Sequence, residues 1–375
     1  MKVAIITLFG VTNIGNRLQN YAVQELLKAH GCQASTLMYE FCDEEGSISY
    51  RFKVFLQSLL IRSGIYNSYF FLRYYKKAPK MVLLEEFNRK YVNLTRKYYF
   101  KTSRMSKYKD DFDYYCVGSD QIWNPLMVQN NDFFFVGFAP SEQSFSLSVS
   151  MGVTSVDSKY QENYRKGFEH IGHLSVRESS LQKMIKETTG RDSIVLLDPT
   201  LLLERSQWHS MARKPAFHLP ERYLATYFLS ELTPAQQTLL EDYARDNDMA
   251  IIDINQTYSN YIGPLEFLYV IENSQFLFTD SFHGTAFSII FGKDFLAFQR
   301  NKSQNMSSRI TTILQTFKLE NRFYCGNNQQ LDESLRDRIE QIKTQDTSHV
   351  GPILMEEKQK AYDFLKNVLA GKDKK

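Results

Sequence analysis

Three observations in the sequence predict an α/β protein whose two open domains, each built on a parallel sheet, face one another across a cleft. The chain has 375 residues, of which 43% are hydrophobic, and this suffices for two domains with buried cores. Strands and helices alternate from the first residues, an order typical of parallel sheets. The alternation breaks at residues 206–221, where Pro215 and Pro220 interrupt the periodicity, and then begins again.

The first domain is expected to span residues 1–205. The apolar run KVAIITLF predicts a buried strand, and residues 16–30 place apolar side chains on one helical face before Gly31 ends the helix. A second strand at 33–39 completes a βαβ opening. Further strands are expected at 112–118, 145–152, 174–178 and 193–199, with a helix at 179–190 that Gly190 closes.

The second domain is expected to span residues 206–345 and to repeat this order. Strands are predicted at 223–229, 250–255, 275–280 and 294–299, with helices at 233–247, 263–274 and 282–292. Thr233 is the expected cap of the first of these helices, and Pro234 suits its first turn. An amphipathic helix at 351–371 is expected to pack back on the first domain, within a C-terminal segment of residues 346–375.

Composition excludes several classes of protein. The net charge is only +3, and no nucleic-acid partner is expected. The four cysteines are far apart with no CxxC pair, which argues against a disulfide framework or a thiolate zinc site and favours a reducing cytoplasm. The first residues resemble a buried strand more than a signal peptide. The longest apolar runs are shorter than the ~18 to 20 residues that a membrane-spanning helix needs.

Residues 51–109 form a basic and aromatic segment, with fifteen Lys or Arg and only two acidic residues, Glu85 and Glu86. One interpretation is a helical insertion with solvated lysines and a buried aromatic face. The other is contact with an anionic surface, such as peripheral binding at the inner face of the membrane through Arg73, Lys76, Lys77 and Lys80.

Four polar stretches should converge at the cleft, where the carboxyl ends of parallel strands usually bind ligands: 10–20, 117–125, 175–179 and 279–285. The first is a glycine-containing loop that opens a helix, and its free N–H groups favour an anion or a sugar hydroxyl. It is neither a dinucleotide fingerprint nor a Walker phosphate loop. Asn16 and Arg17 either contact a ligand there or only cap and solvate the helix.

The second stretch, VGSDQIWNP, combines polar groups with an aromatic ring, as sugar recognition requires. Asp120, at the end of a strand, and Gln121 and Asn124 offer donors and acceptors, while Trp123 is either a stacking platform or a core residue. In the third stretch, Arg177 could bind a carboxylate or phosphate of a ligand through paired hydrogen bonds. Alternatively, it forms an internal ion pair with Glu178 or Asp198.

The fourth stretch places His283 at the start of a helix that Asp280 or Ser281 would cap. A bound anion at this positively polarised end would favour protonated His283, which could then deliver a proton. The alternative is a structural histidine, since no other histidine lies at metal-ligand spacing. Gly284 and Thr285 would keep the next turn slim enough for a ligand to approach.

These motifs together resemble the polysaccharide pyruvyl transferase family over residues 2 to about 300. The resemblance lies in NxGNxLQNYA near the amino end, VGSDQIWNP, SVRESS, LDPTLLL and TDSFHGTAFSIIFGKDF. It implies a fold similar to glycosyltransferase-B and transfer of a pyruvyl ketal from phosphoenolpyruvate to a sugar of a surface polysaccharide or its lipid-linked precursor. It implies no cofactor and no metal.

The resemblance also implies roles for individual residues. His283 would be the general acid or base, and Arg177 would hold the donor. From the residues themselves we further expect donor binding to involve Ser281, Gly284, Thr285 and Arg309. We expect acceptor binding to involve Asn16, Arg17, Asp120, Gln121, Trp123 and Asn124.

One departure from the family pattern bears on the donor. Many members carry an arginine two residues before the histidine, where this chain has Ser281, so either Arg309 or Arg17 has to compensate or the donor differs. Two other functions therefore stay open. They are a glycosyltransferase that uses a nucleotide sugar and a carbohydrate-binding protein of a polysaccharide assembly complex without catalytic activity.

Overall fold

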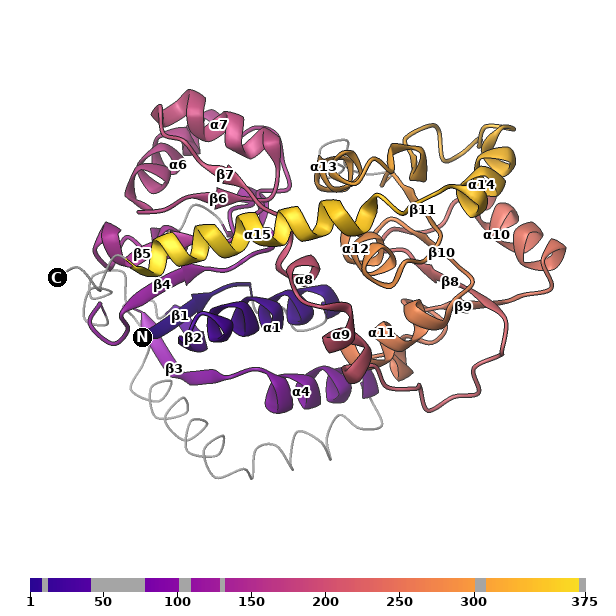
Figure 1. The fold of residues 1–375 in the computed structure, drawn as a ribbon, viewed down its shortest axis with the longest axis horizontal. Helices are drawn as coiled ribbons and strands as arrows, with labels where there is room; N and C mark the ends of the chain where they lie inside the picture. Colours follow the sequence, from indigo (N-terminus) through magenta and orange to yellow (C-terminus); the bar gives the residue numbers. More distant parts are fainter. Residues whose placement is uncertain (9–12, 42–77, 101–108, 129–131, 301–307, 371–375) are drawn as a thin grey trace.

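The computed structural model describes residues 1–8, 13–41, 78–100, 109–128, 132–300 and 308–370. It is an α/β fold with two Rossmann-like lobes, each with a parallel five-stranded sheet, as predicted (Figure 1). No helix in these ranges is both long and apolar enough to cross a membrane.

The N-terminal sheet has the order β3-β2-β1-β4-β5. Its strands are β1 (Lys2–Ile6), β2 (Gln33–Phe41), β3 (Leu94–Phe100), β4 (Tyr114–Val117) and β5 (Ser144–Ser146). The strand expected at 145–152 is shorter because Ser148 has a φ of 50°, outside the extended region. Bridges from Phe145 and Val149 connect this part of the chain to a small sheet of β6 (Ser175–Val176) and β7 (Ile194–Val195).

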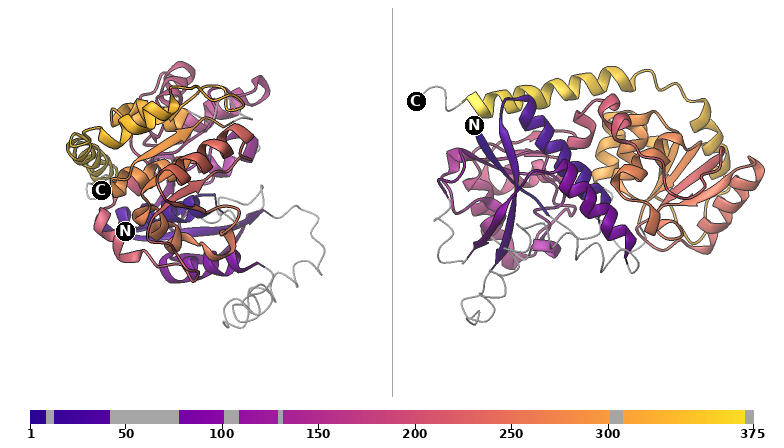
Figure 2. Two further views of the ribbon diagram at one scale, coloured as in Figure 1. Left: turned by 90° about the vertical axis from the view of Figure 1, so that its right-hand side faces the viewer. Right: turned by 90° about the horizontal axis from the view of Figure 1, so that it is seen from below.

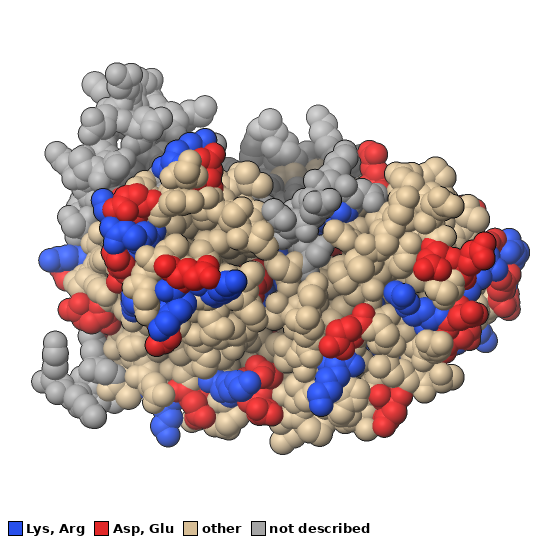
Figure 3. Space-filling model, turned by 90° about the horizontal axis from the view of Figure 1, so that it is seen from above, with Lys and Arg blue, Asp and Glu red and all other residues tan. Residues whose placement is uncertain are grey.

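The basic and aromatic segment contributes a helix and a strand among its described residues. They are α4 (Pro79–Tyr91) and β3, which pairs with β2 at the sheet edge and was not predicted. From α4, Glu86 forms an ion pair of 2.8 Å with Arg213, which also contacts Glu266 of the C-terminal lobe. Residues 42–77 and 101–108, which include Arg73, Lys76 and Lys77, lie outside the described residues. Acidic and basic side chains are mixed over both lobes on the face in Figure 3.

The C-terminal sheet has the order β12-β11-β10-β8-β9. Its strands are β8 (Tyr223–Tyr227), β9 (Ala250–Asp253), β10 (Phe276–Thr279), β11 (Phe295–Phe298) and β12 (Phe323–Tyr324). Thr233 caps α10 (Pro234–Asp246) in a capping box with Gln236, which confirms the predicted helix start.

The remaining helices cover the sheets and connect the lobes. They are α1 (Ile14–Ala29), α5 (Pro125–Val128), α6 (Ser158–His170), α7 (Ser179–Thr189), α8 (Pro199–Leu202), α9 (Arg205–Met211), α11 (Pro264–Asn273), α12 (Phe282–Phe291), α13 (Ser308–Thr316), α14 (Leu335–Thr344) and α15 (Val350–Leu369). Single 3₁₀ turns lie at Asp132–Phe135, Ser141–Gln143, Ser259–Tyr261 and Glu320–Arg322.

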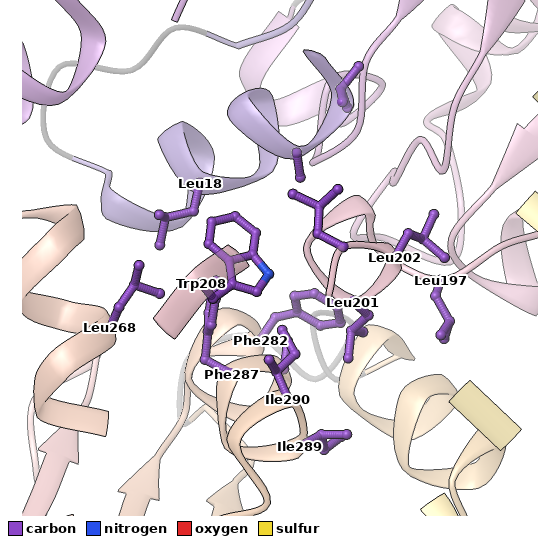
Figure 4. Packing of buried hydrophobic residues seen from close by; sticks show 14 of the residues in the cluster. Leu18, Leu197, Leu201, Leu202, Trp208, Leu268, Phe282, Phe287, Ile289 and Ile290 are labelled. Carbon is purple, nitrogen blue, oxygen red and sulfur yellow. The ribbon is translucent and has the colours of Figure 1, made fainter. Parts of the chain in front are cut away.

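The two lobes share one hydrophobic core at their junction (Figure 4). Trp208 of α9 is fully buried between them, with its ring centroid 5.7 Å from that of Tyr21 in α1 and 5.1 Å from that of Phe287 in α12. Burial of one large apolar side chain contributes about 1.5–3 kcal/mol. Separation of the lobes would therefore be costly, and residues on either side of the junction keep a fixed relation.

Helix α15 runs from the C-terminal lobe back over the N-terminal lobe (Figures 1 and 2). Lys358 forms an ion pair of 2.7 Å with Glu204, and the ring of Tyr362 lies 4.8 Å from that of His30 at the end of α1. The helix thus bridges the lobes on one side of the junction.

Candidate functional site

A cavity of about 260 Å³ lies between the lobes where helices α1 and α12 begin. We call it the interlobe cavity. Both lobes line it, through Leu8, Asn13, Asn16, Asp120, Gln121, Tyr227, Leu229, Ser281, Phe282, His283, Arg300 and Arg309. Six of the twelve residues predicted for the site are among them: Asn16, Asp120, Gln121, Ser281, His283 and Arg309.

His283 lies on the first turn of α12, as predicted. Ser281 is the N-cap, and its Oγ accepts a hydrogen bond of 3.4 Å from the backbone N–H of Gly284. The imidazole is only 6% exposed, and its Nε2 atom has no hydrogen-bond partner among the described residues. Nε2 lies 3.9 Å from Oδ2 of Asp198, a carboxylate that the sequence predicted only as a partner of Arg177.

The opposite side of the His283 ring lies on Gly15, in the first turn of α1. A Cβ atom at position 15 would overlap the imidazole, with Nδ1 as the nearest atom. Glycine at this position therefore allows a helix of the N-terminal lobe to approach a histidine of the C-terminal lobe. Gly284, predicted to make room for a ligand, instead makes room for Thr279 of β10.

Burial lowers the pKa of His283 below its ordinary value of 6.5. The carboxylates of Asp198 and Asp120 oppose this effect, whereas Arg177 and Arg309 add to it. The imidazole is therefore neutral at neutral pH in the absence of an anion. An anion bound beside it would shift the balance toward the protonated form.

Asp120 lies across the cavity from α12, after strand β4. It adopts a left-handed backbone with a φ of 69°, an uncommon conformation that aspartate tolerates better than most residues. Its carboxylate accepts a hydrogen bond of 3.4 Å from Asn16 and lies 3.5 Å from Nη1 of Arg309. Burial opposes ionisation, but His283, Arg177 and Arg309 together lower the pKa of this carboxyl. The carboxylate therefore stays charged.

Arg177 adopts one of the two arrangements that its position allowed, the ion pair with Asp198. Nη2 lies 2.6 Å from Oδ2 of Asp198 and also contacts Ser119, and the guanidinium stacks 4.8 Å from the ring centroid of Phe282. Arg177 does not line the interlobe cavity. It lines a neighbouring void of about 20 Å³, and Phe282 and Arg309 border both spaces. Arg177 and His283 thus meet through one carboxylate, that of Asp198.

Four other predicted site residues do not line the interlobe cavity. Trp123 is a core residue: its side chain is 0% exposed, stacks on Phe135 and donates to the backbone oxygen of Phe134. Asn124 donates to Gln121, and Thr285 donates to the backbone of Ser281. Arg17 donates to the backbone oxygen of Asn13 at 3.1 Å, and burial lowers its pKa to about 10. Arg17 is therefore not among the arginines that line the interlobe cavity.

Sequence reasoning missed one basic residue of the cavity, Arg300. It directly follows the predicted strand at 294–299, so its position at the carboxyl end of a parallel strand was the available signal. Among the residues within the described ranges, no group of three or more His, Cys, Asp or Glu side chains could hold a metal ion.

Comparisons with known proteins bear on the family and the fold. A family model described as polysaccharide pyruvyl transferase matches residues 13–302. No curated protein matches the chain in a sequence search. Among solved structures, a protein assigned as a UDP-N-acetylglucosamine 2-epimerase from Listeria monocytogenes is similar, with a TM-score of 0.57, 10% identity and coverage of 100% of this chain and 97% of that one.

A second similar structure is the UDP-GlcNAc 2-epimerase from Neisseria meningitidis bound to UDP-GlcNAc. It has a TM-score of 0.50 and 11% identity, and the match covers 98% of this chain and 99% of that one. At this low identity the likeness establishes the fold alone. The two-lobed glycosyltransferase-B-like architecture is therefore shared with these proteins.

Proposed function

The chain belongs to the polysaccharide pyruvyl transferase family, and we propose that it transfers the pyruvyl group of phosphoenolpyruvate to two hydroxyls of one sugar as a cyclic ketal. The acceptor would be a surface polysaccharide or its lipid-linked precursor. The observation that carries this proposal is the shared wall of the interlobe cavity, where the His283 imidazole lies with the guanidinium groups of Arg300 and Arg309.

The cationic wall suits the donor. Phosphoenolpyruvate carries a phosphate and a carboxylate, and guanidinium groups bind both kinds of oxyanion through paired hydrogen bonds. The first turn of α12 adds the positive end of a helix to the same wall. A bound donor would raise the pKa of His283, so that donor binding and protonation of the imidazole are coupled.

The reaction begins with a proton transfer. Protonated His283 delivers its proton to the methylene carbon of the donor, and this converts the enol carbon into an oxocarbenium-like centre. One sugar hydroxyl attacks that centre and loses its proton, which restores the imidazolium. The second hydroxyl then forms the other C–O bond as the C–O bond to phosphate breaks, and its proton leaves with the phosphate.

The opposite wall suits a sugar. Asn16, Asp120 and Gln121 offer amide and carboxylate groups that hydrogen-bond hydroxyls, and the Asp120 carboxylate can accept a hydrogen bond from a sugar hydroxyl. No cofactor takes part in this scheme.

The test is a phosphate-release assay with phosphoenolpyruvate and a panel of p-nitrophenyl glycosides, with mass spectrometry of the glycosides. The proposal expects one inorganic phosphate for each glycoside that gains a pyruvyl ketal, and deuterium in the new methyl group when the reaction runs in heavy water. Gain of a hexose from UDP-sugars, with no phosphate release from phosphoenolpyruvate, would favour a nucleotide-sugar glycosyltransferase instead.

A further inference from the structure

We propose that Arg300 binds the phosphate group of the donor and that Arg309, deeper in the same cavity, binds its carboxylate. This inference rests on the proposed function for the identity of the donor. The anion site itself is argued from the geometry of the two arginines and can be tested without any turnover.

The Nε side of the Arg300 guanidinium is held by Asp280, whereas its terminal nitrogens are available to a ligand. Its Nε donates a hydrogen bond of 3.1 Å to the backbone oxygen of Asp280 and lies 3.7 Å from that residue's carboxylate. Asp280 is itself fixed, because its carboxylate accepts from the backbone N–H groups of Leu229 at 2.7 Å and Ser230 at 3.0 Å. Nη1 and Nη2 of Arg300 have no partner within the part of the chain that the structure describes. The edge of the guanidinium formed by Nη1 and Nη2 is therefore held in place and available to an anion.

Arg309 carries the second guanidinium of this wall, and nearby carboxylates balance its positive charge only in part. Its side chain is 7% exposed, Nε has no hydrogen-bond partner in the described ranges, and the only carboxylate in ion-pair range is Asp120 at 3.5 Å. Burial lowers its pKa to about 10, and the positive charges of Arg177 and Arg300 contribute to this shift. Two guanidinium groups thus repel each other across one cavity, and an anion between them would relieve the repulsion.

The difference in exposure between the two arginines indicates which of them binds the phosphate of the donor and which binds its carboxylate. The side chain of Arg300 is 20% exposed and that of Arg309 is 7% exposed. Phosphate is the group that leaves, and a site nearer to solvent favours its departure. The carboxylate stays on the product and can remain at the inner arginine beside Phe282, whose ring centroid lies 5.5 Å from the Arg309 guanidinium carbon.

Arg177, the third arginine nearby, does not line the interlobe cavity. Its Nη2 contacts Asp198 and Ser119, its Nε and Nη1 have no hydrogen-bond partner among the described residues, and its side chain lines the small void beside the cavity. Ser281, on the same wall, uses its hydroxyl to cap α12. Arg300 and Arg309 are therefore the arginines that line the cavity and can meet an anion there beside His283.

The test is isothermal titration of the full chain with inorganic phosphate and, separately, with pyruvate. A charge-assisted hydrogen-bond pair contributes about 1.5–3 kcal/mol, so Arg300→Gln should weaken phosphate binding about 10- to 100-fold and leave pyruvate binding nearly unchanged. Arg309→Gln should show the reverse preference. Arg300→Lys, which keeps the charge but loses the fork, should fall between wild type and Arg300→Gln.

Arg245→Gln, at an exposed arginine of α10 with a 68% exposed side chain, is the matched control and should bind both anions as wild type does. Thermal unfolding of each variant checks that the fold persists. Phosphate binding by Arg300→Gln equal to wild type, or no phosphate binding by wild type, would overturn the inference.

The inference and the proposed function can fail separately. If wild type releases phosphate from phosphoenolpyruvate while Arg300→Gln binds phosphate normally, the function stands and the role of Arg300 is wrong. If Arg300 is needed to bind phosphate but no acceptor elicits phosphate release, the anion site stands and the proposed function is wrong.

Discussion

The two walls of the interlobe cavity come from different lobes and carry different chemistry. The C-terminal lobe presents His283, Arg300 and Arg309, which are cationic or can become so. The N-terminal lobe presents Asn13, Asn16, Asp120 and Gln121, which are amides and one carboxylate. Two sheets of the same architecture thus offer a wall for an anionic donor and a wall for hydroxyl groups.

This difference shows how a shared fold acquires a particular reaction. The strand order places ligand groups at the carboxyl ends of both sheets, but the side chains there decide which ligand binds. The packing of His283 on Gly15 then sets the distance between the walls. Substitutions on one wall at a time separate the contributions of the two walls.

The largest effect is expected for His283→Ala on the C-terminal wall. Removal of a general acid typically lowers the rate by ~10² to 10⁴-fold, so turnover should fall by that amount while phosphate still binds. A steady-state phosphate-release assay measures it. His209→Ala is the control, since that histidine is exposed on α9 and pairs with Glu272. Full activity of His283→Ala would remove the histidine from the mechanism.

Gly15→Ala should disturb the contact between the walls. The added methyl would displace the His283 ring, and misplacement of a catalytic group by about 1 Å can lower the rate about 10²-fold. Gly351→Ala on α15 is the matched control, because no atom lies within 4 Å of its Cβ position. Equal kcat values for the two variants would show that the contact with Gly15 does not position the imidazole.

Asp120→Asn changes the charge of the N-terminal wall with little change in shape. Loss of a charge-assisted acceptor is expected to raise the acceptor KM about tenfold. Pyruvate should bind more tightly, because the carboxylate beside Arg309 is gone. Titration with pyruvate and acceptor kinetics give the two values, and weaker pyruvate binding would contradict the division between the walls.

The smallest effect concerns stability and pH. The pKa of His283 is lowered from 6.5 in the folded state, so below about pH 6.5 the unfolded chain binds more protons at this residue than the folded chain does. The free energy of unfolding should therefore fall as the pH decreases through this range, and less so in His283→Gln. Urea unfolding of both proteins between about pH 5 and pH 8 measures it. A constant difference between them over that range would refute the lowered pKa.

Much of the fold and part of the site could be predicted because their determinants are local. The alternation of strands with helices, the caps at Thr233 and Ser281, and the position of His283 follow from residues close in the chain. Strand β3 was missed because basic residues interrupt the apolar pattern of a sheet-edge strand.

The division of labour among the arginines could not be predicted because it depends on contacts between distant segments. The partner of Arg177 is Asp198, and the two residues meet because they follow β6 and β7, which pair in parallel. Arg300 is fixed by Asp280, twenty residues earlier. For Trp123 the sequence favoured a core position over a sugar platform, and its contacts with Phe134 and Phe135 show that it is a core residue.

A crystal structure of the protein with bound phosphoenolpyruvate would show directly which wall holds the donor. We expect the phosphate on Arg300 and the carboxylate on Arg309, with the methylene carbon facing His283 and with Asn16 and Asp120 available to an acceptor. Density for the donor on the wall of the N-terminal lobe, or outside the interlobe cavity, would contradict this expectation.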